Sequence, residues 1–595
     1  MRQKRSYEDI STGECLKTLG SLVGEFRLPS FLTPLCMIAE VIMEMMIPLL
    51  MATIIDDGVN AGNMNVILRT GGMMLVLALF GLAAGIGGGV FGAKASAGLA
   101  MNLRSKMFRS IQDYSFKNID RFSTSGLITR LTTDVTNIQN AYQILLRMAM
   151  RAPMSLLIAM TMAMVISFRL SLIYLIAVIF LAVFLFAIIR KVSVYFRQVF
   201  EKYDDLNSSV QENVSAIRVV KAYVREEYEK DKFDKAVGNL YRLFVKAESL
   251  MVTNMPVMQA TVYTCILLIS WFGANAILQD ELTTGELMSL LAYCMSILMS
   301  LMMLSMIFVM LTMSLASAQR VVEVIKEKSD ITDPEDPVMQ IKDGSVEFCG
   351  VDFGYNDTAE EYVLKDIDLS VRSGEVIGII GGTGSGKSSL VSLIPRLYDV
   401  SEGSVKVGGV DVRQYSLKTL RDQVSMVLQK NNLFSGTVIE NLRWGNEDAG
   451  IEECRWACAL SGADEFVEKM QGGYEAHIDQ GGANLSGGQR QRLCIARALI
   501  KKPKIIIFDD STSAVDTATD AKIRKALNEN LPDMTVFIIA QRINSVMNAD
   551  RIIVMDDGVI SDIGTHEELL ASSEIYRDVY ESQTNGNGDF DGIAS

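Results

Sequence analysis

The chain has 595 residues, of which 49% are hydrophobic and 21% are charged, and its net charge is −14. This length allows several domains. The acidic balance excludes a general nucleic-acid binder, which needs clustered Lys and Arg, so we expect no nucleic-acid partner. The eight Cys residues show no paired spacing and therefore indicate neither a disulfide framework nor a zinc site.

Apolar residues are concentrated before about residue 316. Six stretches there are long enough to cross a bilayer, which takes roughly 20 helical residues. We expect spans at Phe31–Ile55, Gly71–Phe91, Met148–Ser167, Leu170–Ile189, Val257–Leu278 and Leu287–Leu315. They form an all-α six-helix transmembrane domain at 31–327, which follows a cytosolic segment with an elbow at 1–30.

The loops between the spans predict the orientation of the chain. The loops after the second and fourth spans are long and rich in Lys and Arg, whereas the alternate loops are short and nearly lack them. Positively charged loops stay in the cytoplasm, so both termini are predicted to be cytosolic. Within the long loops, Leu99–Gln112 and Tyr195–Tyr228 have helical periodicity. We interpret them as continuations of transmembrane helices, and the alternative is separate surface helices.

The remainder of the chain has the pattern of a cytosolic α/β domain. A linker at 328–342 contains Pro334 and Pro337, which suit an interdomain connector. Strands and helices then alternate over 343–582, and the Gly/Asn/Asp-rich tail at 583–595 is predicted to be disordered. Short β-branched runs suited to buried parallel strands occur at Glu375–Ile380, Lys504–Phe508, Val536–Ile539 and Arg551–Met555.

A glycine-rich phosphate loop follows the first of these strands. It reads Gly381-Gly382-Thr383-Gly384-Ser385-Gly386-Lys387-Ser388 and matches G-x-x-x-x-G-K-[ST] between a strand and an apolar helix that begins near Ser389. The residues of this loop and Ser389 are the candidate ATP-binding residues here. Backbone N–H groups of such a loop wrap phosphates, and the helix N-terminus adds positive potential. Lys387 is expected to reach the β- and γ-phosphates and Ser388 to hold Mg²⁺. The sequence therefore predicts a P-loop nucleotide-binding domain that binds ATP with Mg²⁺.

Two acids support this prediction. Asp509 and Asp510 follow the apolar strand Ile505–Phe508, which buries its own side chains and places the carboxylates at its C-terminal end. Asp509 is the expected partner of Mg²⁺, through water.

A further motif identifies the family. Leu485-Ser486-Gly487-Gly488-Gln489, followed by Arg490-Gln491-Arg492, resembles the signature of ATP-binding cassette (ABC) proteins. With the phosphate loop and the Asp509 strand, the resemblance covers the C-terminal domain, and the six spans extend it to nearly the full chain. A membrane domain followed by a nucleotide domain is similar to the exporter branch, and it implies an ATPase that drives export by alternating access.

The resemblance implies roles for further residues. Tyr355 matches the aromatic residue that stacks on adenine, and Gln429 matches the glutamine that contacts Mg²⁺ and the attacking water. Ser513–Asp516 matches the loop that crosses the dimer interface. Two nucleotide domains of this family close head to tail, so the signature residues Ser486, Gly487, Gly488 and Gln489 would contact the ATP of a second half-transporter. Ser115–Arg121 and Ser215–Ala222 fit the two coupling helices, which would dock on the nucleotide domains, one of them in the partner.

Two positions depart from the family pattern. Asp510 stands where the family places the Glu that polarises the attacking water, and Gln541 stands where it places a His that contacts the γ-phosphate. This combination, with an intact signature, resembles the degenerate-site subunit of heterodimeric bacterial multidrug-type exporters. We therefore expect a hetero-partner and a slow site in this chain; the alternative is a homodimer with two slow sites. The host membrane implied is a bacterial plasma membrane.

The substrate is less defined by the sequence. One stripe of the sixth span carries methionines at steps of three and four, which would suit a cavity for small apolar or amphipathic ligands but equally a packing or lipid-facing surface. Glu40 and Glu44 lie on one face of the first span and could attract cations or pair with Arg147 or Arg151. Lipid or peptide export, and an ATP-regulated protein that does not transport, remain alternatives. The stripe consists of Met295, Met299, Met302, Met306, Met310 and Met313.

Overall fold

The computed structural model describes residues 11–355, 362–510 and 517–584, apart from some side chains within three of its helices. The described chain forms two compact units. The first comprises the residues up to Gln112 together with Thr124–Glu327, and the second comprises Asp113–Ser123 together with the chain from Lys328 onward.

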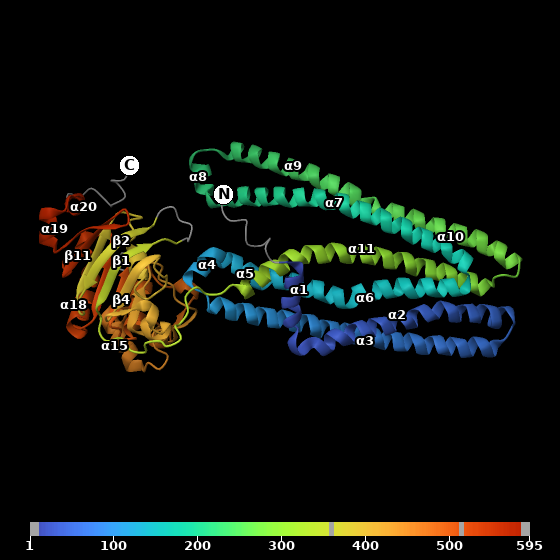
Figure 1. Cartoon of the computed structure of the whole chain (residues 1–595), viewed down its shortest axis with the longest axis horizontal. Coiled ribbons are helices and arrows are strands. Elements are labelled where there is room, and N and C mark those ends of the chain that lie inside the picture. Colours follow the sequence, from blue (N-terminus) through green and yellow to red (C-terminus); the bar gives the residue numbers. More distant parts are fainter. Residues whose placement is uncertain (1–10, 356–361, 511–516, 585–595) are drawn as a thin grey trace. The chain divides into compact units, whose positions relative to one another are not determined.

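The first unit is entirely helical (Figure 1). Six of its helical segments are long and apolar enough to cross a membrane, which confirms the predicted six-span domain. A short helix and a 3₁₀ turn at Gly24–Phe26 precede the first long helix, and π-helical segments lie at Ile54–Asn60 and Arg130–Asp134. The helices are α1 Thr12–Ser21, α2 Arg27–Thr53, α3 Met64–Gln112, α5 Thr124–Thr129, α6 Val135–Ile166, α7 Phe168–Ser215, α8 Ile217–Ala222, α9 Glu226–Val252, α10 Asn254–Leu278 and α11 Thr284–Lys326.

The two predicted cytosolic continuations differ. Helix α3 runs unbroken to Gln112, as expected. The second prediction is wrong in part, because α7 ends at Ser215 and the six-residue α8 and a turn with Val224 at φ 54° lead into α9. Since α8 is itself helical, the apolar periodicity continues through the break and does not reveal it. The reversal is required because α9 packs back along α7 (Figure 1).

Helices α2 and α11 are joined by polar contacts at one end. The hydroxyls of Ser289 and Tyr293 donate to the carbonyls of Pro48 (2.6 Å) and Met45 (2.8 Å). The side chain of Asp56 accepts from the backbone N–H of Gly285 at 2.9 Å. Hydrogen bonds of this kind help to satisfy polar groups of helices that cross a membrane.

Two acidic side chains of α2 are paired with an arginine of α6. One guanidinium, that of Arg151, bridges Glu40 (2.7 Å) and Glu44 (2.8 Å), which confirms the pairing alternative for these two acids. Pairing of this kind reduces the cost of charge within a membrane helix.

The described residues of the second unit form three sheets. Its main sheet has the order β12-β11-β3-β10-β9-β6, and only the β11–β12 pair is antiparallel. A four-stranded sheet has the order β2-β1-β4-β5, and β7 pairs with β8. All four predicted strands are present, as β3, β9, β10 and β11. The strands are β1 Val346–Phe353, β2 Leu364–Val371, β3 Val376–Gly381, β4 Glu402–Val407, β5 Val410–Asp411, β6 Val424–Val427, β7 Gly436–Thr437, β8 His477–Ile478, β9 Ile505–Asp509, β10 Thr535–Ile539, β11 Arg551–Asp556 and β12 Val559–Gly564.

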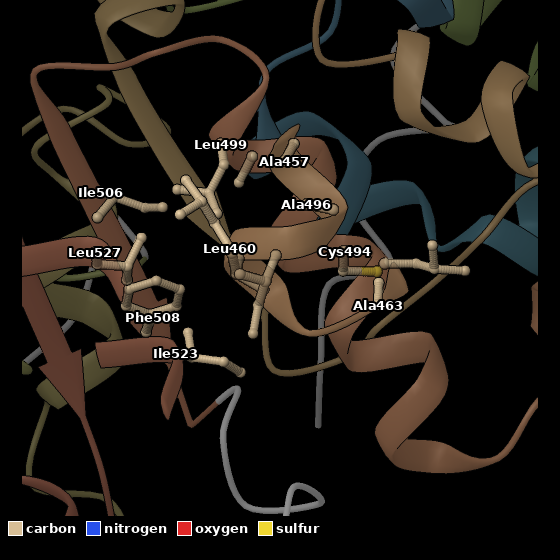
Figure 2. Packing of buried hydrophobic residues seen from close by; sticks show 14 of the residues in the cluster. Ala457, Leu460, Ala463, Cys494, Ala496, Leu499, Ile506, Phe508, Ile523 and Leu527 are labelled. Atoms are coloured by element: carbon tan, nitrogen blue, oxygen red, sulfur yellow. The ribbon is translucent and has the colours of Figure 1, made fainter. Parts of the chain in front are cut away.

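One apolar core connects the main sheet with the surrounding helices. Figure 2 shows Ile506 and Phe508 of β9 in the same buried cluster as Ala496 and Leu499 of α17. The strand that carries Asp509 and the helix that begins at the signature motif are therefore fixed by one packed interior. The helices of this unit are α4 Phe116–Phe122, α12 Lys387–Ser392, α13 Leu417–Gln423, α14 Val438–Arg443, α15 Ile451–Ser461, α16 Asp464–Val467, α17 Gly487–Leu499, α18 Thr517–Asn530, α19 His566–Ser572 and α20 Glu574–Thr584.

Candidate functional site

The candidate site is built where four neighbouring parallel strands end. Strands β3, β10, β9 and β6 lie side by side in that order, so their carboxyl ends share one edge of the sheet. The phosphate loop follows β3, Gln541 follows β10, Asp510 follows β9 and Gln429 follows β6. This edge is the usual ligand-binding side of an α/β sheet. Residues spread over 160 positions of sequence are thus brought together by strand order alone.

The phosphate loop is closed around its own lysine. Lys387 Nζ donates to the carbonyls of Gly381 (2.9 Å) and Gly382 (2.7 Å) and lies 3.5 Å from Ser385 Oγ. Burial lowers the pKa of this ammonium group, and the carboxylates of Asp510 and Asp509 oppose that shift. At the loop's end, Gly386 has φ 92°, and a Cβ there would lie 2.7 Å from Leu364 Cδ2. The loop therefore needs glycine at this position.

Ser388 and Asp509 form the candidate Mg²⁺ site. Ser388 Oγ donates to Asp509 Oδ1 at 2.7 Å. Burial of the Asp509 carboxyl, which is 6% exposed, raises its pKa, and the neighbouring Asp510 adds to the shift. A hydroxyl beside a desolvated carboxylate is an all-oxygen donor set of the kind Mg²⁺ prefers. The residues present therefore fit this ion.

Asp510 is held by two amides. Its Oδ2 accepts from Gln541 Nε2 at 3.0 Å and lies 3.5 Å from Gln429 Nε2. Burial raises the pKa of Asp510, while the bond from Gln429 and the charge of Lys387 act in the opposite direction. The backbone at Asp510 is in the left-handed region (φ 46°) and its N–H donates to Ile539 O of β10. The structure thus brings the three candidate catalytic residues together around one carboxylate oxygen.

The remaining candidates lie at two further places. Tyr355, which is 41% exposed, bonds through its hydroxyl to Ser389 Oγ at 2.8 Å. Ser486 caps α17, because its Oγ accepts from Gln489 N–H (3.3 Å) while Gln489 Oε1 accepts from Ser486 N–H (2.9 Å). Ser486 and Gly487 are exposed, so the positive end of this 13-residue helix faces outward. The candidate interface loop Ser513–Asp516 lies outside the described residues.

Sequence reasoning missed Gln583. Its Nε2 donates to Gln541 O at 2.8 Å, and its Oε1 accepts from Ile543 N–H at 2.9 Å. Helix α20 extends to Thr584, two residues into the segment predicted to be disordered, and carries this clamp. No motif marks Gln583, because the contact joins residues that are 40 and 42 positions apart.

Comparisons with known proteins match both units. A family model described as the ABC transporter transmembrane region matches residues 30–317, and one described as ABC transporter matches residues 364–513. An uncharacterized ABC transporter ATP-binding protein, YfiB, of Bacillus subtilis is 36% identical over 96% of this chain and 98% of its own length.

Two further relatives carry functional names. The probable multidrug resistance ABC transporter ATP-binding/permease protein YheI of Bacillus subtilis is 33% identical over 81% of this chain and 82% of its own length. The ATP-dependent lipid A-core flippase of Desulfotalea psychrophila is 33% identical over 81% of this chain and 84% of its own length. The chain therefore belongs to the ABC transporter family, as an integral membrane half-transporter of the exporter type whose ATP-binding domain couples ATP hydrolysis to transport.

Proposed function

We propose that this chain is the degenerate-site subunit of a heterodimeric bacterial exporter. Its own ATP site holds nucleotide and hydrolyses it slowly, and its signature residues complete the faster site of a partner half-transporter. The observation that carries this proposal is the arrangement at Asp510, whose short carboxylate accepts from Gln541 and lies close to Gln429.

Residues that match the family pattern would bind ATP, and residues that depart from it would make ATP hydrolysis slow. Lys387 would contact the β- and γ-phosphates through its ammonium group, and the backbone of the phosphate loop would surround them. Ser388 and Asp509 would hold Mg²⁺, which supplies charge neutralisation for the leaving phosphate when bound. Tyr355 would pack on adenine. All of these groups are present, so affinity for ATP is expected to be retained.

Hydrolysis needs a base that reaches the attacking water. Asp510 is one methylene shorter than Glu, and a displacement of about 1 Å can lower a rate by about 10²-fold. Its Oδ2 is also engaged by the neutral amide of Gln541. That amide can donate a hydrogen bond but cannot carry the positive charge of a protonated His at the γ-phosphate. Both differences act on the hydrolytic step and not on binding.

The N-terminus of α17, which carries the signature motif, supports a role in the ATP site of the partner subunit. The exposed N-terminus of α17 places Ser486 and the glycine N–H groups where a second nucleotide domain can reach them. Such an N-terminus suits the phosphates of the partner's ATP. The short helix α8 would dock on the partner, because the apolar side chains of Ile217, Val219 and Tyr223 are exposed in this chain.

The export substrate is proposed to be small and apolar or amphipathic. Met295, Met299, Met302, Met306 and Met310 are between 37% and 63% exposed on α11, whereas the opposite face of the helix is buried; the side chain of Met313 lies outside the described residues. A flexible, polarisable methionine surface suits varied apolar ligands. The relative named for multidrug resistance supports this class, and the relative named as a lipid A-core flippase supports the lipid-export alternative. The membrane is proposed to be the bacterial plasma membrane, with both termini and the ATP-binding domain in the cytosol.

The test begins with purification of the tagged chain from its native host and identification of co-purifying proteins by mass spectrometry. A second half-transporter in equal amount, with Glu and His at the positions equivalent to Asp510 and Gln541, is expected. ATP turnover of the reconstituted pair is then compared for Asp510→Asn and for the equivalent amide variant of the partner. The first is expected to retain most of the turnover and the second to lose nearly all of it.

Two results contradict the proposal. One is recovery of this chain alone as a homodimer that transports. The other is loss of turnover in Asp510→Asn while ATP binding and assembly persist, because Asp510 would then perform the main hydrolysis. Transport assays with cationic drugs, neutral drugs and fluorescent lipids distinguish a drug exporter from a lipid exporter.

A further inference from the structure

Helix α4 is preceded and followed in sequence by transmembrane helices, yet it belongs to the ATP-binding unit. Asp113–Ser123 groups with the chain from Lys328 onward, and α4 (Phe116–Phe122) is stabilised by a capping box between Ser115 and Asn118. Two hydrogen bonds contribute to its attachment. The hydroxyl of Tyr398 donates to Asp120 Oδ2 at 2.7 Å, and Asn118 Nδ2 donates to Lys328 O at 3.4 Å.

Tyr398 is the residue of the ATP-binding unit that holds this attachment. Its ring packs against the apolar core beneath the phosphate loop. Burial, with added effects from the hydrogen bond and the charge of Asp120, raises the pKa of Tyr398 above its usual range. A phenol is protonated at neutral pH in any case, so this hydroxyl can donate to Asp120. The ring of Phe116 lies against the same tyrosine, with centroids 6.0 Å apart.

The other side of Tyr398 meets the candidate adenine-stacking residue. The rings of Tyr398 and Tyr355 are perpendicular, with centroids 5.1 Å apart, and Phe353 contacts both. Edge-to-face packing is a favoured geometry for aromatic pairs. The Tyr355 hydroxyl is at the same time bonded to Ser389, one residue beyond the candidate Mg²⁺ ligand Ser388. A continuous set of contacts thus runs from the nucleotide site to α4.

We propose that Tyr398 is a positioning residue that links occupation of the adenine subsite to the docking of α4. This inference rests on the proposed function of Tyr355. Adenine packed on Tyr355 restrains the rings of Tyr355 and Tyr398. The restrained Tyr398 then holds Asp120 and Phe116 of α4 more firmly in place. In this proposal, stacking on the base turns the Tyr355 ring away from Ser389, so the Tyr355–Ser389 hydrogen bond opposes binding. The docking of α4 therefore responds to the base of the nucleotide and not to its phosphates.

By thermodynamic linkage, the coupling between ATP binding and the docking of α4 acts in both directions. If adenine binding strengthens the docking of α4, weakening that docking must lower the affinity for ATP by the same factor. Asp120→Asn should therefore weaken ATP binding about two- to tenfold, although Asp120 lies on the far side of Tyr398 from the adenine subsite. Ser389→Ala removes the competing hydrogen bond and should tighten ATP binding about two- to tenfold.

The experiment measures hydrogen exchange of residues 113–123 in the assembled full-length transporter in nanodiscs. The probes are ATP and inorganic tripolyphosphate, each with Mg²⁺, because tripolyphosphate supplies the phosphates without a base. Exchange in 113–123 is expected to slow at least threefold with ATP and to change little with tripolyphosphate, while residues 381–389 become protected by both. In Tyr398→Phe the response of 113–123 to ATP is expected to vanish while 381–389 remain protected.

Tyr362→Phe is the matched control, because it also removes a phenol that bonds to a carboxylate, that of Glu402; it should behave as the wild type. An equal response of 113–123 to both probes, or an ATP response that persists in Tyr398→Phe, overturns the proposal while leaving ATP binding intact. If 381–389 are protected by neither probe, the ATP site itself is refuted, and with it this inference. Tyr398→Phe keeps the ring and its packing, so a loss of response is not a folding defect.

Discussion

The buried ion pair between Arg130 and Glu323 gives a prediction whose size follows from the structure. Arg130 lies in the π-helical segment that leads into α6, and Glu323 lies near the end of α11. Their side chains are 6% and 7% exposed, and Nη1 lies 2.9 Å from Oε2. Removing one partner of a buried pair costs about 3–5 kcal/mol. Arg130 also donates to the carbonyl of Arg320 at 3.2 Å, so we expect Glu323→Gln to fall at the lower end, about 3 kcal/mol.

The assay is equilibrium unfolding of the purified chain in mixed detergent micelles, followed by circular dichroism. Glu323→Gln should lower the free energy of unfolding by that amount, which corresponds to a change of about 100-fold in the unfolding equilibrium. The double variant Arg130→Met/Glu323→Leu should lose much less than the two single changes combined, because no unpaired charge remains. Asp231→Asn, which breaks an exposed pair with Lys235, is the control and should have no measurable effect.

A cost below about 1 kcal/mol for Glu323→Gln would refute the reasoning, because the guanidinium would then be adequately solvated without its partner. Additive effects in the double variant would refute direct coupling of the two side chains.

Three further substitutions test other contacts. Gly386→Ala places a Cβ 2.7 Å from Leu364 and forces a side chain into φ 92°, so fluorescence titration should show at least tenfold weaker binding of an ATP analogue. Gly285→Ala places a Cβ 2.5 Å from Ala52 O and should reduce the unfolding free energy by about 1–3 kcal/mol, whereas Gly238→Ala, with no atom within 4 Å, should not reduce it. Gln583→Ala releases the Gln541–Ile543 backbone, so hydrogen exchange of residues 541–544 should accelerate; Glu581→Ala, on the same helix but exposed, should leave it unchanged.

The parts of the fold that sequence could predict are those governed by local pattern. Six apolar stretches of bilayer length gave six spans. The four β-branched runs became neighbouring strands of one sheet, because such runs pack only when both faces are buried. Once β3, β9 and β10 are parallel, the groups after them must meet at one edge. The convergence of Lys387, Asp509 and Gln541 follows from that rule.

Contacts between distant segments could not be predicted in this way. The hydrogen bond between Tyr398 and Asp120 joins residues 278 positions apart, and neither residue belongs to a motif with a fixed spacing. The end of α7 at Ser215 is expected only from the resemblance, which places a coupling helix at Ser215–Ala222, and the apolar periodicity of Tyr195–Tyr228 does not predict it. A short helix after the break preserves the apolar period, so only the reversal of the chain distinguishes it from a continuous helix.

The geometry at Asp510 changes how its two departures from the family pattern should be interpreted. From sequence, Asp510 and Gln541 are separate substitutions. In the structure they are hydrogen-bond partners, because the shorter carboxylate lies 3.0 Å from the Gln541 amide. Substituting only one of the two residues would disturb this hydrogen bond. Glu at position 510 would bring a longer side chain against the Gln541 amide, and His at position 541 would face the shorter carboxylate of Asp510. The two positions therefore form one local arrangement, and we expect the effects of substitutions at 510 and 541 on ATP hydrolysis to be non-additive.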